Sequence, residues 1–269
     1  MQKISLKHFT VTKLIVITLF GIAACGILPE KIDETKGWSA AQLYEESKND
    51  LSNGNYENAI KKLEKLESRY PFGTYAQQAQ IDIPYIYYKQ DDQAQALAAI
   101  ERFIKLHPNH ENLDYIYYLR GLVNFNDRIS LLQSLAKQDM SERDPKAARE
   151  AFDAFKALVT RFPNSKYTPD ALLRMKYLVN TMAQYDLHVA KYYYRRGAYL
   201  ASANRAQSAI KEYPDAPAIE EALFVLYKSY DKMGLITLRD DTKRIFNQNY
   251  PDSKFTEVNK EVKSWWELW

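Results

Sequence analysis

The feature that most constrains this chain is a fivefold recurrence of an aromatic residue or histidine followed by proline. Each pair stands at the end of an amphipathic stretch, and the pairs are Tyr70-Pro71, His107-Pro108, Phe162-Pro163, Tyr213-Pro214 and Tyr250-Pro251. The prolines are separated by 37, 55, 51 and 37 residues. A recurrence at this spacing predicts an array of structural repeats along the chain.

Two further marks recur at fixed distances before these prolines. Twelve residues earlier, four of the five repeats have a small residue: Ala59, Ala96, Ala151 and Ser202. Seventeen residues earlier, three of the five have a glycine: Gly54, Gly197 and Gly234. A glycine permits a turn with positive φ, a small residue lets two helices touch, and a proline ends a helix.

These marks are typical of tetratricopeptide (TPR) repeats, whose unit is about 34 residues long. Apolar residues between the marks follow helical spacing, and the strict alternation of a strand is absent. We therefore predict an all-α fold, in which about five TPR-like helix pairs form a right-handed superhelical solenoid. The predicted helices are 38–53, 55–70, 74–90, 92–107, 110–126, 145–162, 168–196, 198–213, 217–233 and 236–249.

The interval lengths divide this array into regions. The 55-residue interval predicts an insertion at 127–144, between an N-terminal TPR region (38–126) and a C-terminal one (145–251). Asp144 should N-cap the next helix, with Pro145 at its first position. The 51-residue interval lengthens the first helix of repeat four into a strut. Pro84 falls inside a predicted helix and should kink it near Ile83.

The N-terminus has the pattern of an export signal. Residues 1–24 combine three lysines, no acid and an apolar run of eleven residues, which is too short to cross the roughly 30 Å of a hydrocarbon core. The single cysteine of the chain, Cys25, follows directly and resembles the acylated cysteine of a bacterial lipobox. We expect a lipoprotein signal peptide at 1–24, lipidation of Cys25 and a lipid-anchored, flexible tether at 25–37. Gly26 in place of an aspartate favours the outer membrane.

Charge and motifs exclude several functions. The lysines of the signal segment account for the whole formal charge of +3, so the remaining chain is neutral and unsuited to nucleic acid. His107 and His110 flank Pro108 in a turn, and we expect no metal and no cofactor. There is no glycine-rich phosphate loop, no Gly-x-Ser-x-Gly and no Cys/His nucleophile pair. The sequence therefore indicates a protein that is not an enzyme.

The candidate binding residues are aromatic and basic. The first helices of repeats two and three carry a candidate peptide groove: Tyr85, Tyr87, Tyr88, Tyr115, Tyr117 and Tyr118. About half of these tyrosines are expected to pack between helices, and the rest to stack on a bound peptide. Repeat four carries Arg195, Arg196 and Arg205, which either are solvated or pair with partner carboxylates. The tail at 252–269 holds three tryptophans in its last five residues and should cover the last repeat or meet a partner.

A lipobox followed by TPR repeats with a broken third repeat resembles the BamD (ComL) family. The segments that carry the resemblance are Tyr56-Glu-Asn-Ala-Ile60, Arg69-Tyr-Pro-Phe72, Ile100-Glu-Arg-Phe-Ile104, Asp114-Tyr115, Arg120-Gly-Leu122, Arg143-Asp-Pro145, Phe162-Pro-Asn-Ser165, Arg196-Gly-Ala-Tyr199 and Asn204-Arg205. The similarity extends from residue 25 to about residue 251.

The resemblance implies a periplasmic lipoprotein on the outer membrane of a Gram-negative bacterium, as a subunit of the β-barrel assembly (Bam) complex. It implies that the C-terminal repeats dock on a POTRA domain of BamA, with Asn204 and Arg205 at that contact. It also implies that the N-terminal groove meets unfolded outer-membrane β-barrel substrates or other Bam lipoproteins. Two alternatives remain open: a TPR lipoprotein that scaffolds peptidoglycan-synthesis or envelope-division proteins, and a lipid-anchored cell-wall hydrolase.

Overall fold

The structure is a computed structural model that describes residues 33–125 and 145–257. In these ranges every regular element is a helix, which confirms the all-α, TPR-like prediction. The helices are α2 (Ala40–Ser52), α3 (Tyr56–Arg69), α4 (Thr74–Lys89), α5 (Gln93–Leu106), α6 (Leu113–Phe125), α8 (Lys146–Arg161), α9 (Thr168–Arg195), α10 (Tyr199–Glu212), α11 (Ile219–Lys232), α12 (Ile236–Asn249) and the short α13 (Lys254–Glu257). Each predicted helix is present, with ends that differ by at most three residues.

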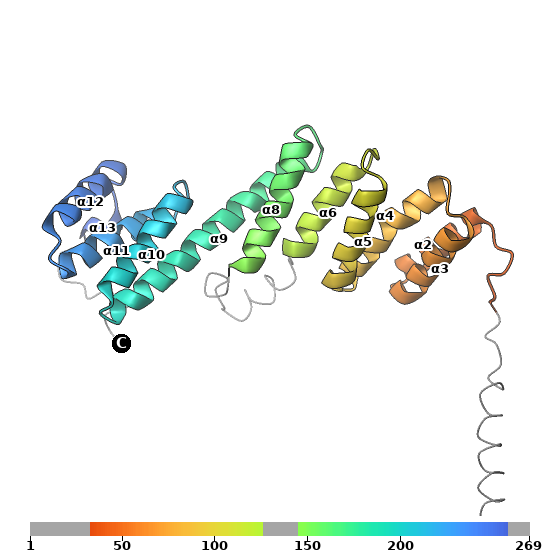
Figure 1. Ribbon diagram of the computed structural model, residues 1–269, viewed down its shortest axis with the longest axis horizontal. Coiled ribbons are helices and arrows are strands. Elements are labelled where there is room, and N and C mark those ends of the chain that lie inside the picture. The colour runs from red at the N-terminus through yellow and green to blue at the C-terminus, as the bar shows by residue number, and fades with distance from the viewer. Residues whose placement is uncertain (1–32, 126–144, 258–269) are drawn as a thin grey trace, which may run out of the picture.

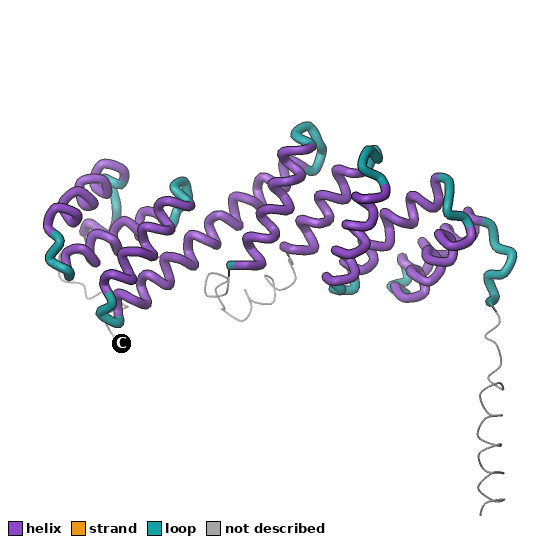
Figure 2. Tube along the Cα trace, viewed as in Figure 1, coloured by secondary structure: helices purple, strands orange, loops and turns teal. Residues whose placement is uncertain are grey.

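The helices stack side by side along an elongated molecule, from α2 at one end to α12 and α13 at the other (Figure 1). Helices that follow one another in the chain pack together, as α2 does on α3 and α9 on α10. Short loops join them (Figure 2). The 28-residue α9 is the predicted strut, since it crosses between the N-terminal and the C-terminal groups of helices.

The aromatic–proline pairs end the second helix of each repeat in one conformation. The five residues before proline have φ between −134° and −129° and ψ between 54° and 65°, at Tyr70, His107, Phe162, Tyr213 and Tyr250. Each still donates its backbone N–H to the carbonyl four residues earlier. The ring of the following proline excludes the α conformation at these positions, so the helix stops there.

The glycine and small-residue marks also have the predicted roles. Gly54, Gly197 and Gly234 adopt φ of 76°, 74° and 73° in the turns between paired helices. In repeat two the same position is occupied by Asp91, at φ 60°. The four small residues twelve places before proline are fully buried at helix contacts: Ala59, Ala96, Ala151 and Ser202.

Three hydrophobic cores follow one another along the stack. The first includes α2 and α3, the middle one α6 and α8, and the last α10 and α11. Helix α9 belongs to two of them, because Ala171 and Leu178 lie in the middle core whereas Met182 and Leu187 lie in the last. The middle and last cores are therefore joined through packed side chains of α9, together with Ala148 and Phe152 of α8, which pack against both.

Helix α4 contains Pro84, as the predicted helix 74–90 does, and continues from Thr74 to Lys89 with the proline buried. Burial between neighbouring helices outweighs the hydrogen bond that proline cannot donate. Pro145 is the N-cap of α8 rather than its first helical residue, which is Lys146. Asp144, the insertion at 127–144, the signal peptide, Cys25 and most of the tail lie outside the described residues.

Candidate functional site

The structure brings the six predicted groove tyrosines together on α4 and α6, but as packing residues. Tyr117 is buried, and the other five are half-buried against the middle core: Tyr85, Tyr87, Tyr88, Tyr115 and Tyr118. About half of them were expected to pack between helices and the rest to stack on a peptide, and the structure shows that all six contribute to packing. Their rings pack between helices, and only part of each ring is exposed to solvent.

Tyr118 is the best-defined member of this group. Its ring stacks on Tyr167 with centroids 4.7 Å apart, and its hydroxyl donates to Asp170 Oδ2 at 2.7 Å. Burial, together with the bond to Asp170, raises the pKa of Tyr118 to about 12. Burial likewise raises the pKa of the neighbouring Tyr115 hydroxyl. Both hydroxyls therefore remain protonated hydrogen-bond donors at neutral pH.

Tyr117 is held between two guanidinium groups. Arg161 donates to its hydroxyl at 2.9 Å, and the Arg161 and Arg120 guanidinium carbons lie 5.4 and 4.7 Å from its ring centroid. Arg120 is itself bound to Glu101 Oε1 at 3.0 Å. These contacts use both the face and the hydroxyl of Tyr117 within the chain, which leaves little of it for a ligand.

A buried carboxylate that the sequence analysis missed lies between α2 and α4. Asp82 accepts from the Tyr44 hydroxyl at 2.9 Å and from Gln78 Nε2 at 3.1 Å, and Lys48 Nζ lies 3.7 Å away. Burial and this carboxylate raise the pKa of Tyr44. The Tyr44 ring also meets Tyr75, whose side chain is exposed. No repeat mark singles out Asp82, because two of its partners, Tyr44 and Lys48, come from another helix.

The predicted basic residues lie on the pair formed by α9 and α10. Arg195 and Arg196 are exposed at the end of α9, and the Arg196 guanidinium lies 5.4 Å from the ring of Tyr192. Asn204 and Arg205 are exposed residues of α10. The structure thus places an exposed cationic surface on repeat four.

Arg205, however, has a carboxylate partner within the chain. Its Nη1 donates to Asp186 Oδ1 of α9 at 3.2 Å, and the Asp186 side chain is only 11% exposed whereas that of Arg205 is 48% exposed. Burial raises the pKa of Asp186, and the charge of Arg205 opposes that rise. From the sequence, Arg205 was expected either to be solvated or to pair with a carboxylate of a partner protein. Its contact with Asp186 is neither of these, and it results from the packing of α9 against α10.

The same region connects α8 to the last residues of α10. Arg149 Nη2 donates to the Tyr213 hydroxyl at 3.3 Å and lies 3.8 Å from Glu212 Oε2. Glu212 adds to the raised pKa of Asp186, and Arg149 opposes it. Repeats three and four therefore share a connected set of charges that spans α8, α9 and α10.

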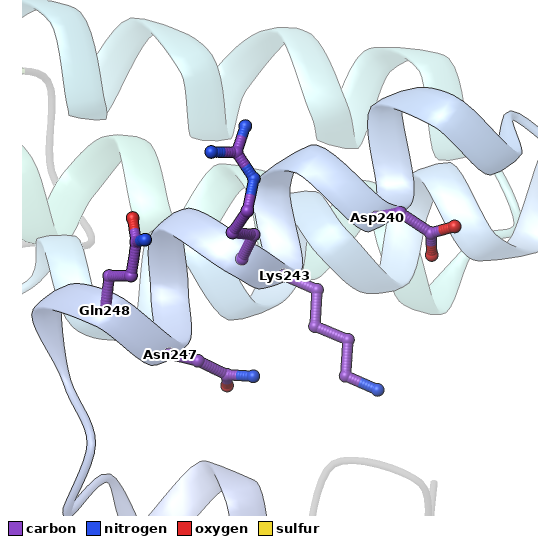
Figure 3. A pocket seen from close by; sticks show the side chains of 5 residues that line it. Asp240, Lys243, Asn247 and Gln248 are labelled. Atoms are coloured by element: carbon purple, nitrogen blue, oxygen red, sulfur yellow. The ribbon is translucent and has the colours of Figure 1, made fainter.

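A hollow on α12 offers polar groups without a catalytic arrangement. Its described lining comes from one helix and consists of Asp240, Lys243, Arg244, Asn247 and Gln248 (Figure 3).

In the described ranges, no group of three or more His, Cys, Asp or Glu side chains could hold a metal ion. The same part of the chain contains no helix long and apolar enough to span a membrane. His107 instead pairs its Nε2 with Gln80 Oε1 at 2.5 Å.

Known proteins resemble this chain over nearly its whole length. A family model described as YfiO, outer membrane lipoprotein, matches residues 37–245. A protein of Neisseria meningitidis serogroup A is 45% identical over 266 residues, which is 98% of this chain and 100% of the relative. A Vibrio cholerae protein is 39% identical over 91% of this chain and 99% of its own length. A Pasteurella multocida protein is 35% identical over 96% of each. All three are named outer membrane protein assembly factor BamD.

Proposed function

Because this chain belongs to the BamD family of outer membrane lipoproteins, we propose that it is a non-enzymatic, lipid-anchored subunit of the Bam complex on the periplasmic face. It is an outer membrane protein assembly factor. The observation that carries this conclusion is the similarity to BamD proteins: two of the relatives are 45% and 35% identical to this chain over 98% and 96% of its length. The all-helical fold agrees with it. The scaffold for peptidoglycan-synthesis proteins is not favoured.

The anchor in this proposal is Cys25. Support comes from its place directly after the apolar run of the signal segment and from the family's description as outer membrane lipoproteins. No other residue of the chain can form the thioether, since this is the single cysteine. Metabolic labelling with a fatty acid tests the anchor: the wild type should be labelled and Cys25→Ala should not. Label on Cys25→Ala would refute it.

We further propose that the exposed basic surface of repeat four docks on BamA. Arg195 and Arg196 support this, because they are exposed and sit at the end of α9, where a POTRA carboxylate could meet two guanidinium groups. Reversing both charges should lower the affinity for BamA by about tenfold or more, mainly through slower association. Copurification of BamA with Arg195→Glu/Arg196→Glu measures the effect.

A matched control carries the same change of charge at the other end of the molecule. Lys61 and Lys105 are exposed on α3 and α5, in the N-terminal repeats. Lys61→Glu/Lys105→Glu should recover as much BamA as the wild type. Equal recovery of BamA by both double variants would exclude Arg195 and Arg196 from the interface, provided circular dichroism shows both to be folded.

The contact between Arg205 and Asp186 changes how Arg205 must be tested. Arg205→Glu would set a second carboxylate beside a buried one, so a loss of BamA could reflect damage to the fold. Asp186→Asn removes the internal partner but keeps the guanidinium, whereas Asp186→Asn/Arg205→Gln removes both charges. If Arg205 meets BamA, only the double variant loses binding. Equal BamA recovery from these two variants would exclude Arg205 from the interface.

We propose that the N-terminal repeats receive unfolded β-barrel substrates or other Bam lipoproteins. The support is the polar–aromatic surface of α2 and α4, where the exposed ring of Tyr75 lies beside the Tyr44–Asp82 pair. Such rings combine apolar area with hydrogen-bonding groups, which suits extended peptides of varied sequence. Tyr75→Ala should weaken crosslinking of a nascent β-barrel to the lipoprotein, whereas Tyr177→Ala, which removes an equally exposed ring from α9, should not. Equal crosslinking by the two variants would exclude Tyr75 from substrate binding.

A further inference from the structure

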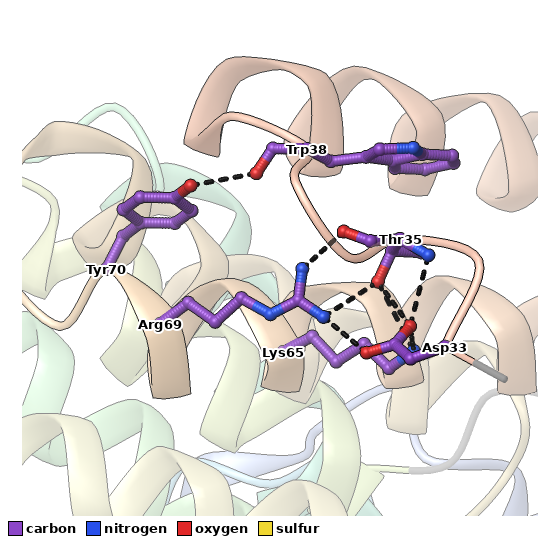
Figure 4. Close-up of polar contacts among 6 residues, drawn as sticks. All are labelled: Asp33, Thr35, Trp38, Lys65, Arg69 and Tyr70. Carbon is purple, nitrogen blue, oxygen red and sulfur yellow. Dashed lines mark hydrogen bonds and ion pairs between the residues drawn. The ribbon is translucent and has the colours of Figure 1, made fainter. Parts of the chain in front are cut away.

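The first described residues are bound to α3 before the first helix begins. Asp33 Oδ1 lies 2.6 Å from Lys65 Nζ, and Asp33 Oδ2 pairs with Arg69 Nη2 (Figure 4). Lys65 and Arg69 are one helical turn apart on α3, so both reach the same carboxylate. Among the described residues, Asp33 is therefore the first that contacts the folded body.

Thr35 completes this arrangement. Its hydroxyl donates to Asp33 Oδ1 at 2.7 Å, its backbone N–H donates to the same oxygen at 3.1 Å, and Arg69 Nη1 donates to its carbonyl. The residue is only 7% exposed. The bonds from Lys65 and Thr35 hold the pKa of the Asp33 carboxyl well below its usual range, so the carboxylate stays charged at neutral pH.

The segment then turns sharply into α2. Trp38 donates its backbone N–H to Thr35 O at 3.0 Å, and its own carbonyl accepts from the Tyr70 hydroxyl at 2.8 Å. Gly37 between them has φ 109°, a conformation that side chains disfavour. We call residues 33–38 with Lys65, Arg69 and Tyr70 the N-terminal clasp. It occupies the last part of the tether predicted at 25–37, which is bound there to Lys65 and Arg69.

We propose that the N-terminal clasp is an end-stop that limits how far the repeats can stand from the membrane. The proposal rests on the lipidation of Cys25 proposed above. Asp33 is the eighth residue after Cys25, and eight Cα-to-Cα steps span at most about 26–29 Å, whatever the conformation. Without the clasp the free chain would extend to Ser39, the N-cap of α2, and could span about 46–50 Å. The clasp therefore removes about 20 Å of reach and holds the N-terminal repeats near the lipid surface.

The full-length, lipidated protein allows a direct distance measurement. Because acylation consumes the single native cysteine, Asn58→Cys on the exposed face of α3 gives one thiol for a donor dye. Time-resolved energy transfer to an acceptor on lipid headgroups, in phosphatidylethanolamine/phosphatidylglycerol vesicles, reports the distance from α3 to the membrane. Asp33→Ala should extend the upper limit of that distance by up to about 20 Å.

Two further variants separate the clasp from a general loss of charge. Lys65→Ala/Arg69→Ala opens the clasp from the helix side and should lengthen the distance as Asp33→Ala does. Glu57→Ala removes an exposed ion pair with Lys61 on the same helix, 3.5 Å long, and should leave the distance unchanged. Circular dichroism checks that each variant is folded.

The possible failures are distinct. If the wild type carries no fatty-acid label and does not bind vesicles, the lipidation of Cys25 is wrong, and the end-stop is overturned with it. If the wild type is lipidated but Asp33→Ala gives the same distance distribution, the anchor stands and the clasp is not an end-stop.

Discussion

At the residue scale, Gly121 marks the closest approach between α6 and α8. A Cβ atom there would lie 2.2 Å from Cε1 and 2.3 Å from Cδ1 of Phe155. The Phe155 ring is fully buried, and the ring centroids of Tyr118 and Phe125 lie 6.2 and 6.1 Å from its own, so it has little room to move. The motif Arg120-Gly-Leu122 noted in the sequence thus has a packing cause.

We predict that Gly121→Ala destabilises the protein by up to about 2 kcal/mol. Overpacking a filled core costs about 1–3 kcal/mol, which exceeds the gain of about 1 kcal/mol when alanine replaces glycine in a helix. Urea unfolding measures the loss. Phe155→Leu should absorb part of it, so that the double variant is more stable than the two single effects added together. Strict additivity would show that this contact is not the cause.

The pair formed by Asp186 and Arg205 predicts a dependence on pH. Because burial raises the pKa of Asp186, the folded state binds this proton more tightly than the unfolded state, whose Asp pKa is about 3.9. The contribution of Asp186 to stability therefore falls as pH rises from about 3.9 through the raised value. Arg205 limits that fall, because it favours the charged form.

We therefore expect Arg205→Ala to cost about 1–2 kcal/mol at pH 7 and less at pH 4, where Asp186 is more often protonated. The magnitude stays below that of a fully buried pair because Arg205 is 48% exposed. Thermal unfolding at the two pH values gives the comparison. In an Asp186→Asn background, the difference between the two pH values should disappear. An equal cost of Arg205→Ala at both would contradict the pairing.

The ion pair between Asp186 and Arg205 was not predicted from the sequence. Asp186 and Arg205 are nineteen residues apart and lie on different helices, so their contact depends on the packing of α9 against α10. For the same reason the sequence did not indicate the contact of Asp82 with Tyr44 or that of Gly121 with Phe155. The roles of Gly54 and Ala59 were predictable, because a turn or a helix crossing leaves its mark at a fixed distance from the proline of its own repeat.

At the scale of the element, the turn between paired helices has one geometry with two residue types. Gly197 adopts φ 74° and Asp91, at the equivalent place in repeat two, adopts φ 60°. Left-handed backbone costs about 1–2 kcal/mol for a residue with a Cβ atom, and Asp tolerates it better than most. Helix α5 begins directly afterwards, with Asp92 as its N-cap.

We predict that Gly197→Ala destabilises by about 1–2 kcal/mol, whereas Asp91→Gly causes no loss. Open space surrounds a Cβ atom at Gly197, so strain in the backbone, and no clash, is the cause. Chemical denaturation of the two variants and of Asp91→Ala measures this. Asp91→Ala should be less stable than Asp91→Gly. The reverse order would show that the turn conformation does not decide stability here.

Helix boundaries were largely predictable from the chain, because apolar spacing and the proline signals are local. The predicted helix 74–90 includes Pro84, and α4 does continue through it, although the burial of that proline is visible only in the structure. The degree to which each tyrosine is exposed to solvent was not predictable. The residues Tyr115 and Tyr118 have the composition of a binding surface, yet their contacts with Tyr167 turn them into packing residues.

At the scale of the whole molecule, α9 connects the middle and the last hydrophobic cores. Its first half packs in the middle core through Leu178 and its second half in the last core through Met182 and Leu187. Thr181 stands between them and donates its hydroxyl to Tyr177 O at 3.0 Å. In repeat proteins, stability is close to a sum of units and of the interfaces between neighbours. An intact α9 therefore contributes to the coupling between these units, beside Ala148 and Phe152 of α8, which pack against both cores.

We predict that Thr181→Pro separates unfolding into two transitions. Proline lacks the N–H that closes the helical bond to Tyr177 O, and its ring clashes with that carbonyl, at a cost of about 3 kcal/mol or more. Hydrogen exchange in increasing urea should then give different midpoints for α6 with α8 and for α10 with α11, which share one midpoint in the wild type. Thr181→Ala, which removes only the hydroxyl, should keep the single midpoint. Coincident midpoints in Thr181→Pro would mean that the cores are coupled by contacts other than the continuity of α9.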